Sequence, residues 1–350
     1  MKYAKLAVLL PAFALLFTLA ACNPEADGPT GGPSQEASAG LLPSGEEPIE
    51  TPDGQPDIRL AVLSGPTGVG AAKLLDSADN NPGALRASYA YDIYSDNSQL
   101  VAGLTTGEID IATMASNVAV NLYNKDGGVK IIAGGTLGVL HILEGGGGNS
   151  IHSIEDLRGK TIYSAGKGAN PEYILRYLLQ GVDVTVEYED AAWISSKLLS
   201  GDIQYAMLPV PAATAAIAKS EGQVRDAIDV TDAWNELQGG SQLIMTAVVV
   251  RAGFAEEHPE LVDAFLADYE ESINYVNGNI DAAAELVAGY GFAPNEAIAK
   301  KAIPQCHLAF ISGNEMLSAL SGYFKALYDI DPASVGGSLP DDGIYYIQAG

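Results

Sequence analysis

The chain has 350 residues, a length typical of about two domains. Hydrophobic residues make up 47% of it and charged residues 18%, which excludes a disordered or coiled-coil protein. The 44 acidic against 18 basic residues leave a net charge of −26, and such a surface excludes nucleic acid as a partner because it repels phosphate. With 2 Cys and 4 His residues there is no disulfide framework and no zinc-ligand spacing, so we expect no metal and no cofactor.

The first residues indicate a signal peptide over 1–21. Lys2 and Lys5 precede an apolar run over 6–19 that is too short for a comfortable membrane span. The Leu-Ala-Ala-Cys sequence that ends this segment resembles the bacterial lipobox, which implies cleavage before Cys22 and lipidation of that residue. An ordinary secretory signal that happens to be cleaved near a cysteine is the alternative.

The segment 22–56 is rich in Pro, Gly, Ser and Glu, and from residue 23 onward it has no basic or aromatic residue. It cannot bury enough apolar surface to offset the entropy of ordering, so it predicts a disordered tether. No other apolar run of membrane-spanning length follows.

From residue 57 onward, short β-rich runs alternate with amphipathic helical patterns. Strands are predicted over 58–63, 89–94, 109–114, 129–134, 161–164, 182–188, 203–208 and 243–250. Helices are predicted between them over 68–77, 98–105, 117–124, 171–179, 191–199 and 211–218, and after residue 250 helices alone are predicted, over 253–277, 279–289, 294–303 and 313–328. This alternation favours the α/β class, with mostly parallel sheets covered on both faces.

Two glycine-rich breaks suggest a division into lobes. They are the run of four glycines at 145–148 and the Gln-Gly-Gly-Ser sequence at 238–241. We therefore expect a first lobe of 57–145 plus 244–350 and a second lobe of 146–243, with a hinge where the chain crosses twice. A single sheet with two surface loops is the alternative.

Four stretches carry a resemblance to a known family over most of 57–330: 58–70, 104–112, 156–162 and 199–206. In order and outline they resemble the type II periplasmic solute-binding proteins of ABC importers, in the group that binds sulfonates, taurine, nitrate and thiamine-pyrimidine precursors. The resemblance implies a two-lobed fold with an interlobe cleft, a monomer, a small-molecule solute and the subunits of an ABC permease as partners.

In open α/β sheets a ligand lies beyond the carboxyl ends of the strands, where loops enter helices. Three such turns supply candidate ligand-binding residues: Ser64, Gly65, Thr67 and Gly68 after the first strand, Ser116 and Asn117 after the third, and Lys167, Gly168 and Asn170 in the predicted second lobe. Exposed N–H groups there suit a carboxylate, a sulfonate or a ring nitrogen. Plain turns, a helix cap and a solvated lysine are the structural alternatives.

Tyr94 and Trp193 are the aromatic candidates for stacking on a planar ligand, although a core role is an equal alternative. Pro209 belongs to a loop that resembles the family loop closing the second lobe. Val210 stands where family members often have an acidic residue, which disfavours recognition of an amine at this point. No arginine falls in a candidate loop, which favours a neutral or heterocyclic solute over a small anion.

Catalysis has little support, so we expect a binding protein that is not an enzyme. The histidines are widely spaced, no serine lies in a nucleophile-elbow pattern, and Cys306 beside His307 is best explained as a buried thiol. The sequence thus predicts an extracytoplasmic lipoprotein, anchored to the bacterial cell membrane, that delivers a small polar or heterocyclic solute to an ABC importer by cleft closure. A pyrimidine-synthase-like enzyme on the same fold and a partner-binding sensor lipoprotein are the alternatives.

Overall fold

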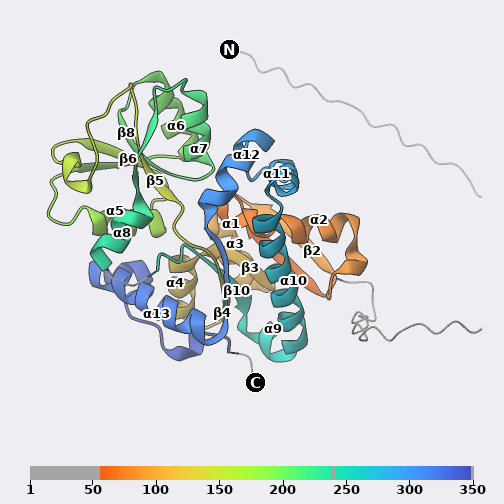
Figure 1. The fold of residues 1–350 in the computed structure, drawn as a ribbon. Helices are drawn as coiled ribbons and strands as arrows, with labels where there is room; N and C mark the ends of the chain where they lie inside the picture. The colour runs from red at the N-terminus through yellow and green to blue at the C-terminus, as the bar shows by residue number, and fades with distance from the viewer. Residues whose placement is uncertain (1–55, 239–241, 348–350) are drawn as a thin grey trace, which may run out of the picture. The chain divides into compact units, whose positions relative to one another are not determined.

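The computed structural model describes residues 56–238 and 242–347 (Figure 1). The predicted signal peptide, Cys22 and nearly all of the predicted tether lie outside these residues. Within the described ranges, no helix is both long and apolar enough to cross a membrane.

Two separate sheets organise the described chain, each with helices on both faces. The first sheet has the strand order β11-β4-β10-β3-β1-β2. In that order its strands are Leu308–Ile311, Val129–Thr136, Thr246–Arg251, Ile111–Ala115, Ile58–Leu63 and Tyr89–Tyr94. Strand β1 pairs in parallel with β2 and β3, whereas β10 is antiparallel to both β3 and β4.

The second sheet has the order β7-β6-β8-β5-β9. Its strands, in that order, are Thr185–Tyr188, Thr161–Ser164, Tyr205–Pro209, Leu140–Glu144 and Arg225–Asp229. Strand β6 is parallel to β7 and β8, and β5 is antiparallel to β8 and β9. The α/β class is confirmed, but both sheets are mixed rather than mostly parallel. Strands β5 and β10, which follow the two crossings between the sheets, run in the reverse direction, and so does β11.

The helices of the first lobe's amino-terminal part are α1 (Pro66–Val69), α2 (Ala72–Asn80), α3 (Asn97–Thr106) and α4 (Ser116–Asp126). The second lobe has α5 (Asn170–Leu178), α6 (Ala191–Ser200), α7 (Ala212–Lys219) and α8 (Val230–Gln238). The carboxyl-terminal helices are α9 (Ala252–Glu257), α10 (Pro259–Gly278), α11 (Ile280–Gly289), α12 (Glu296–Ala302) and α13 (Gly313–Ile330). Short 3₁₀ turns η1 to η5 occupy Pro82–Ala84, Ile154–Leu157, Ile303–Cys306, Pro332–Val335 and Asp342–Ile344.

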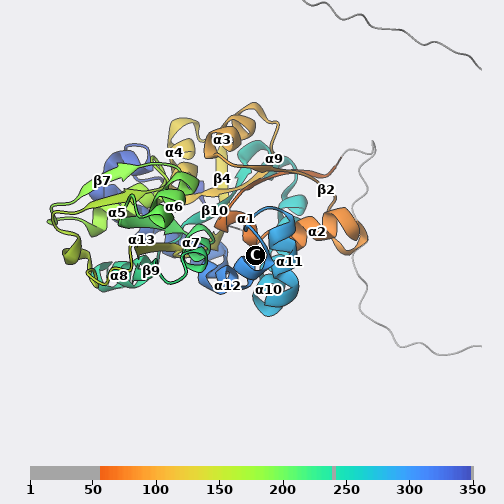
Figure 2. The ribbon, with the colours of Figure 1, turned by 90° about the horizontal axis from the view of Figure 1, so that it is seen from above.

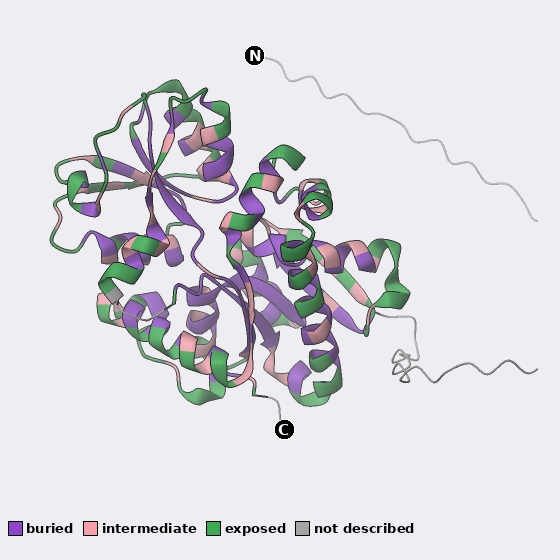
Figure 3. Cartoon of the chain, viewed as in Figure 1, coloured by how far each residue is buried: buried purple, intermediate pink, exposed green. Residues whose placement is uncertain are grey.

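Burial follows the layers of this architecture. Figure 2 shows α3 and α4 on one side of the first sheet and α10 and α11 on the other. In the second lobe, α6 contacts α7 while α5 contacts α8. The central strands are buried and the outer faces of the helices are exposed (Figure 3). Strand β3, buried along its whole length, shows why a continuous apolar run predicted a central strand.

Strand β5 corrects the expected lobe boundary. We expected residue 145 to end the first lobe's opening segment, but β5 (Leu140–Glu144) pairs with β8 and β9 of the second sheet. The chain therefore first crosses between the sheets at 137–139, directly after β4, and it returns between α8 and β10. Pairing partners decide the lobe of a strand, and the four glycines that suggested the boundary only form the turn after β5.

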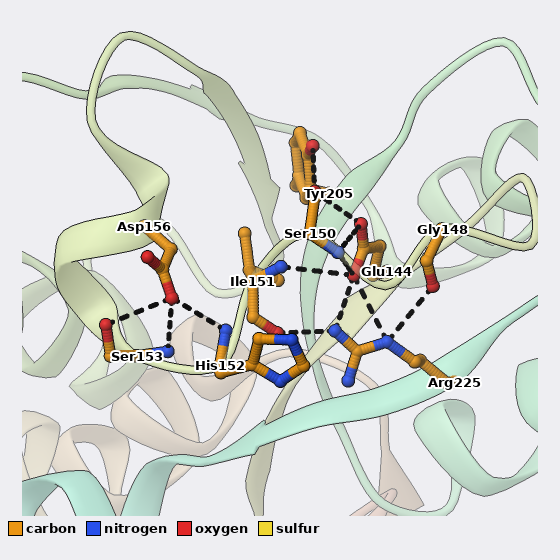
Figure 4. Close-up of polar contacts among 9 residues, drawn as sticks. All are labelled: Glu144, Gly148, Ser150, Ile151, His152, Ser153, Asp156, Tyr205 and Arg225. Carbon is orange, nitrogen blue, oxygen red and sulfur yellow. Dashed lines mark hydrogen bonds and ion pairs between the residues drawn. The ribbon is translucent and has the colours of Figure 1, made fainter.

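That turn is held by a buried carboxylate (Figure 4). Glu144, whose side chain is fully buried, accepts hydrogen bonds from the backbone and hydroxyl of Ser150 and forms an ion pair of 2.6 Å with Arg225. Burial alone would raise the pKa of Glu144, but these bonds outweigh it and lower the pKa below its usual range. A Cβ on Gly148 would lie 2.5 Å from Glu144 Oε1, so the carboxylate requires glycine there.

Candidate functional site

The two lobes meet along a line of direct hydrogen bonds, which we call the seam: Ser116 and Asn117 of α4, Gly168 and Asn170 at the start of α5, and the backbone of Ile244 and Met245. Asn170 Nδ2 donates to Met245 O at 2.6 Å and to Ser116 Oγ at 3.1 Å. Ser116 Oγ in turn donates to Ile244 O at 2.5 Å, and Asn117 Nδ2 donates to Gly168 O at 3.4 Å. The seam thus brings together candidate residues from two turns that lie far apart in sequence.

Both asparagine side chains in the seam keep an unused acceptor. Asn117 and Asn170 are 0% and 1% exposed, and in each of them Oδ1 is buried without a hydrogen-bond partner. The amide orientations are well defined, because each Nδ2 faces a backbone carbonyl, which can only accept. The free atoms are therefore acceptors, and a buried acceptor without a donor costs free energy.

In the loop before α5, the backbone of Gly168 takes part in the seam, whereas the side chain of Lys167 does not. Gly168 N donates to Glu172 Oε2 at 2.7 Å, and the left-handed backbone at Gly168, with φ of 75°, is one that glycine adopts readily. Lys167 is exposed. The most informative candidate loop of the sequence therefore brings a carboxylate, Glu172, into contact with the seam.

The four candidate residues in the turn after β1 lie in different environments. Gly65 has φ of 87°, a left-handed backbone that favours glycine, and a Cβ there would meet open space. Gly68 differs, because a Cβ there would lie 2.4 Å from the ring of Phe292. Its missing side chain makes room for a core residue. Thr67 is buried, and Ser64 is half-buried with its N–H donating to Tyr94 O at 2.7 Å.

The aromatic candidates have partners within their own lobes or lie at an edge. Trp193 packs on Tyr163 with ring centroids 5.7 Å apart, and Lys197 lies 5.8 Å from its ring. Tyr94 ends β2, the edge strand of the first sheet, and is half-buried. Pro209 ends β8, paired with Leu140 beside the first crossing between the lobes. The seam does not include these three residues.

Three further interlobe contacts were not predicted from the sequence. Thr214 Oγ1 of α7 donates to Gln305 Oε1 at 2.7 Å, and Arg176 of α5 forms an ion pair of 2.7 Å with Asp331. Trp234 of α8 packs on Tyr323 of α13 with ring centroids 5.9 Å apart. Figure 1 shows α13 beside α5, as their contacts require. No local pattern marks these residues, because each pair is joined only by tertiary folding.

Of the two residues suspected of chemistry, Cys306 lies in the core and His307 is exposed. Cys306 is buried, and burial raises the pKa of its thiol to about 12, which makes it a poor nucleophile. His307 Nδ1 lies 2.6 Å from Gly138 O, beside the first crossing. Among the described residues no group of three or more His, Cys, Asp or Glu side chains could hold a metal ion.

Comparisons with known proteins agree with this architecture. Residues 90–283 match the family model described as NMT1/THI5 like. A structure of an ABC transporter protein from Parabacteroides distasonis is 24% identical with a TM-score of 0.70, covering 83% of this chain and 99% of that one. The periplasmic aliphatic sulphonate binding protein SsuA from Escherichia coli is 16% identical with a TM-score of 0.67, covering 84% and 94%.

The alkanesulfonate-binding protein SsuA from Xanthomonas axonopodis, bound to MOPS, is 15% identical with a TM-score of 0.62, covering 81% of this chain and 94% of that one. A comparison with curated proteins found no significant match. At these identities the solved structures show the fold, which confirms the expected two-lobed periplasmic-binding-protein architecture.

Proposed function

Because the chain belongs to the NMT1/THI5-like family and has the fold of periplasmic binding proteins, we propose that it captures a small solute between its lobes for an ABC importer. The observation that carries this proposal is the seam. Two buried amide side chains from opposite lobes each keep an unused acceptor where the lobes touch. Buried polar groups are usually hydrogen-bonded, so these two acceptors, whose side chains contact each other's lobe, are the atoms that a solute between the lobes would satisfy.

The mechanism is a shift of population between open and closed forms. A solute that contacts both lobes binds the closed form more tightly, and that difference in affinity drives closure. The chain performs no chemistry on the solute in this proposal, and the buried, weakly acidic thiol of Cys306 supports that role.

The remaining parts of the proposal concern location and partners. We place the protein outside the cytoplasm as a monomer, anchored by lipid on Cys22, where it presents its closed form to the permease subunits. The lipobox-like sequence before Cys22 supports the anchor. Replacing Cys22→Ser should release the protein from the membrane fraction, and a variant that stays there would contradict the anchor alone.

Solute binding is tested on the purified full-length protein, isolated without refolding. Native mass spectrometry would detect a co-purified small molecule, and a thermal-shift screen would then cover nitrate, sulfonates, thiamine precursors and flavins. A ligand at a hundred times its Kd stabilises a protein by about 2.7 kcal/mol, which a melting curve resolves. A co-purified solute or a clear shift supports the proposal. No solute and no shift across the screen would contradict it.

A further inference from the structure

The seam has a defined hydrogen-bonding character. Asn117 Oδ1 and Asn170 Oδ1 are acceptors. Asn170 Nδ2 already donates to Met245 O and Ser116 Oγ, and Asn117 Nδ2 donates one N–H to Gly168 O. A group that satisfies Oδ1 must be a donor, that is, an N–H or an O–H. A sulfonate or nitrate has acceptor oxygens alone, so it would leave both Oδ1 atoms unpaired and bring like partial charges together.

The charges near the seam also favour a ligand with N–H or O–H donors over an anion. Glu172 accepts from Gly168 N, which places a carboxylate next to the residue that Asn117 contacts. Every arginine has a partner elsewhere: Arg59 and Arg251 with Asp110, Arg86 with Asp268, Arg158 with Gly181 O, Arg176 with Asp331 and Arg225 with Glu144. Lys167 is the basic residue of this loop, and its side chain is exposed.

Resting on the proposed solute-binding function, we propose that Asn117 and Asn170 determine specificity by accepting hydrogen bonds from the solute. The site takes a solute that presents N–H or O–H donors on a neutral or cationic group, such as an amide, an amidinium or an aminated ring. It rejects sulfonates, although proteins of the same fold bind them.

The first test compares small ligands that differ only in their polar group, which is an amide, an amidine or a sulfonate. Benzamide, benzamidine and benzenesulfonate are compared in thermal shift and calorimetry on the full-length protein, with acetamide, acetamidine and methanesulfonate as a smaller set. We expect donors to stabilise the protein and sulfonates to leave the melting temperature unchanged. Sulfonate binding as tight as donor binding would overturn this inference and leave solute capture standing. An absence of binding in both sets, with no co-purified solute, would overturn both.

The second test uses Asn117→Ala. Its side chain makes one long hydrogen bond of 3.4 Å, so its removal should leave folding intact. We expect the Kd for the tightest donor ligand to rise about tenfold, as for one lost hydrogen bond of about 1.4 kcal/mol. The control is Asn277→Ala, which removes an exposed amide on α10 that donates to Leu308 O at 3.0 Å. A circular-dichroism melt confirms folding, and an unchanged Kd in a folded Asn117→Ala variant would overturn the proposal.

Discussion

At the scale of single residues, polar groups in the described chain fall into two kinds. Glu144 is buried and fully engaged by Ser150, Ile151 and Arg225, so it stabilises one turn of the second lobe. Asn117 and Asn170 are equally buried yet keep an unused acceptor. The sequence predicted the two asparagines from their positions after strands. It did not predict Glu144, because a glutamate that ends a strand is usually solvated.

Gly148 offers a direct test of the Glu144 turn. In Gly148→Ala the new Cβ would lie 2.5 Å from Glu144 Oε1, and the carboxylate cannot move without breaking its bonds to Ser150 and Arg225. We expect the free energy of unfolding to fall by about 1–3 kcal/mol, measured by urea denaturation. Gly289→Ala, in a helix where a Cβ meets open space, should instead raise it by about 0.4–1 kcal/mol, because alanine restricts the unfolded chain. Equal effects would contradict the role of Glu144.

His141 should make stability depend on pH. It is buried, with Nδ1 2.9 Å from Asp226 Oδ2 in an ion pair. Burial alone would lower its pKa, but the contact with Asp226 and the charge of Asp229 outweigh burial and raise it. The stabilisation is therefore complete below the unfolded pKa of about 6.5 and disappears as pH rises through the folded pKa.

The expected result is that His141→Gln loses more stability relative to the natural protein at about pH 5.5 than at about pH 8.5. Urea denaturation across this range measures it, with His152→Gln as the control because that histidine is exposed. A stability difference that stays constant with pH would contradict the raised pKa.

At the scale of elements, local signals predicted most of the structure. All eight predicted strands are present, and the predicted helix over 68–77 divides into α1 and α2 as that over 253–277 divides into α9 and α10. Strands β5, β9 and β11 and helix α8 were not predicted. The expectation of helices alone after residue 250 was wrong for β11, which is four residues long and, among the described strands, pairs with β4 alone. Such a short edge strand depends on its neighbour rather than on its own pattern.

Helix α6 illustrates an element whose start is determined locally. Asp190 Oδ1 accepts from Trp193 N at 2.8 Å and satisfies one of the free donors of the first turn. Asp190→Ala should lower the free energy of unfolding by about 1 kcal/mol in urea denaturation. Glu189→Ala removes the same charge from the neighbouring exposed residue, and it should have a smaller effect. If the two variants are equally destabilised, the effect is one of charge and not of capping.

At the scale of the whole described chain, the proposed mechanism makes the contacts between the lobes set the balance of open and closed forms. The seam, the Thr214–Gln305 bond, the Arg176–Asp331 ion pair and the packing of Trp234 on Tyr323 all join the second lobe to the first. Separation of the lobes must break those of the four contacts whose residues move apart. The affinity for any solute therefore includes the free energy of these contacts.

Arg176→Ala tests this coupling. The ion pair is half-exposed, with 43% and 27% of the two side chains accessible, so we expect a modest effect of at most about 1 kcal/mol. The open form should gain population, and the Kd for a solute should rise by at most about fivefold. Calorimetry and small-angle scattering measure the two changes. Lys197→Ala, which breaks an ion pair within the second lobe, is the control and should change neither.

The sequence by itself determined the α/β class, most elements, the caps and the turns that hold the candidate residues, because these depend on periodicity and on residues a few positions apart. Only the tertiary structure decided that β5 belongs to the second lobe and that Gly68 makes room for Phe292. It also decided that Asn117 and Asn170 meet in one seam with unused acceptors. Pairing and burial join residues more than 50 positions apart, and no local pattern encodes which partners remain unpaired.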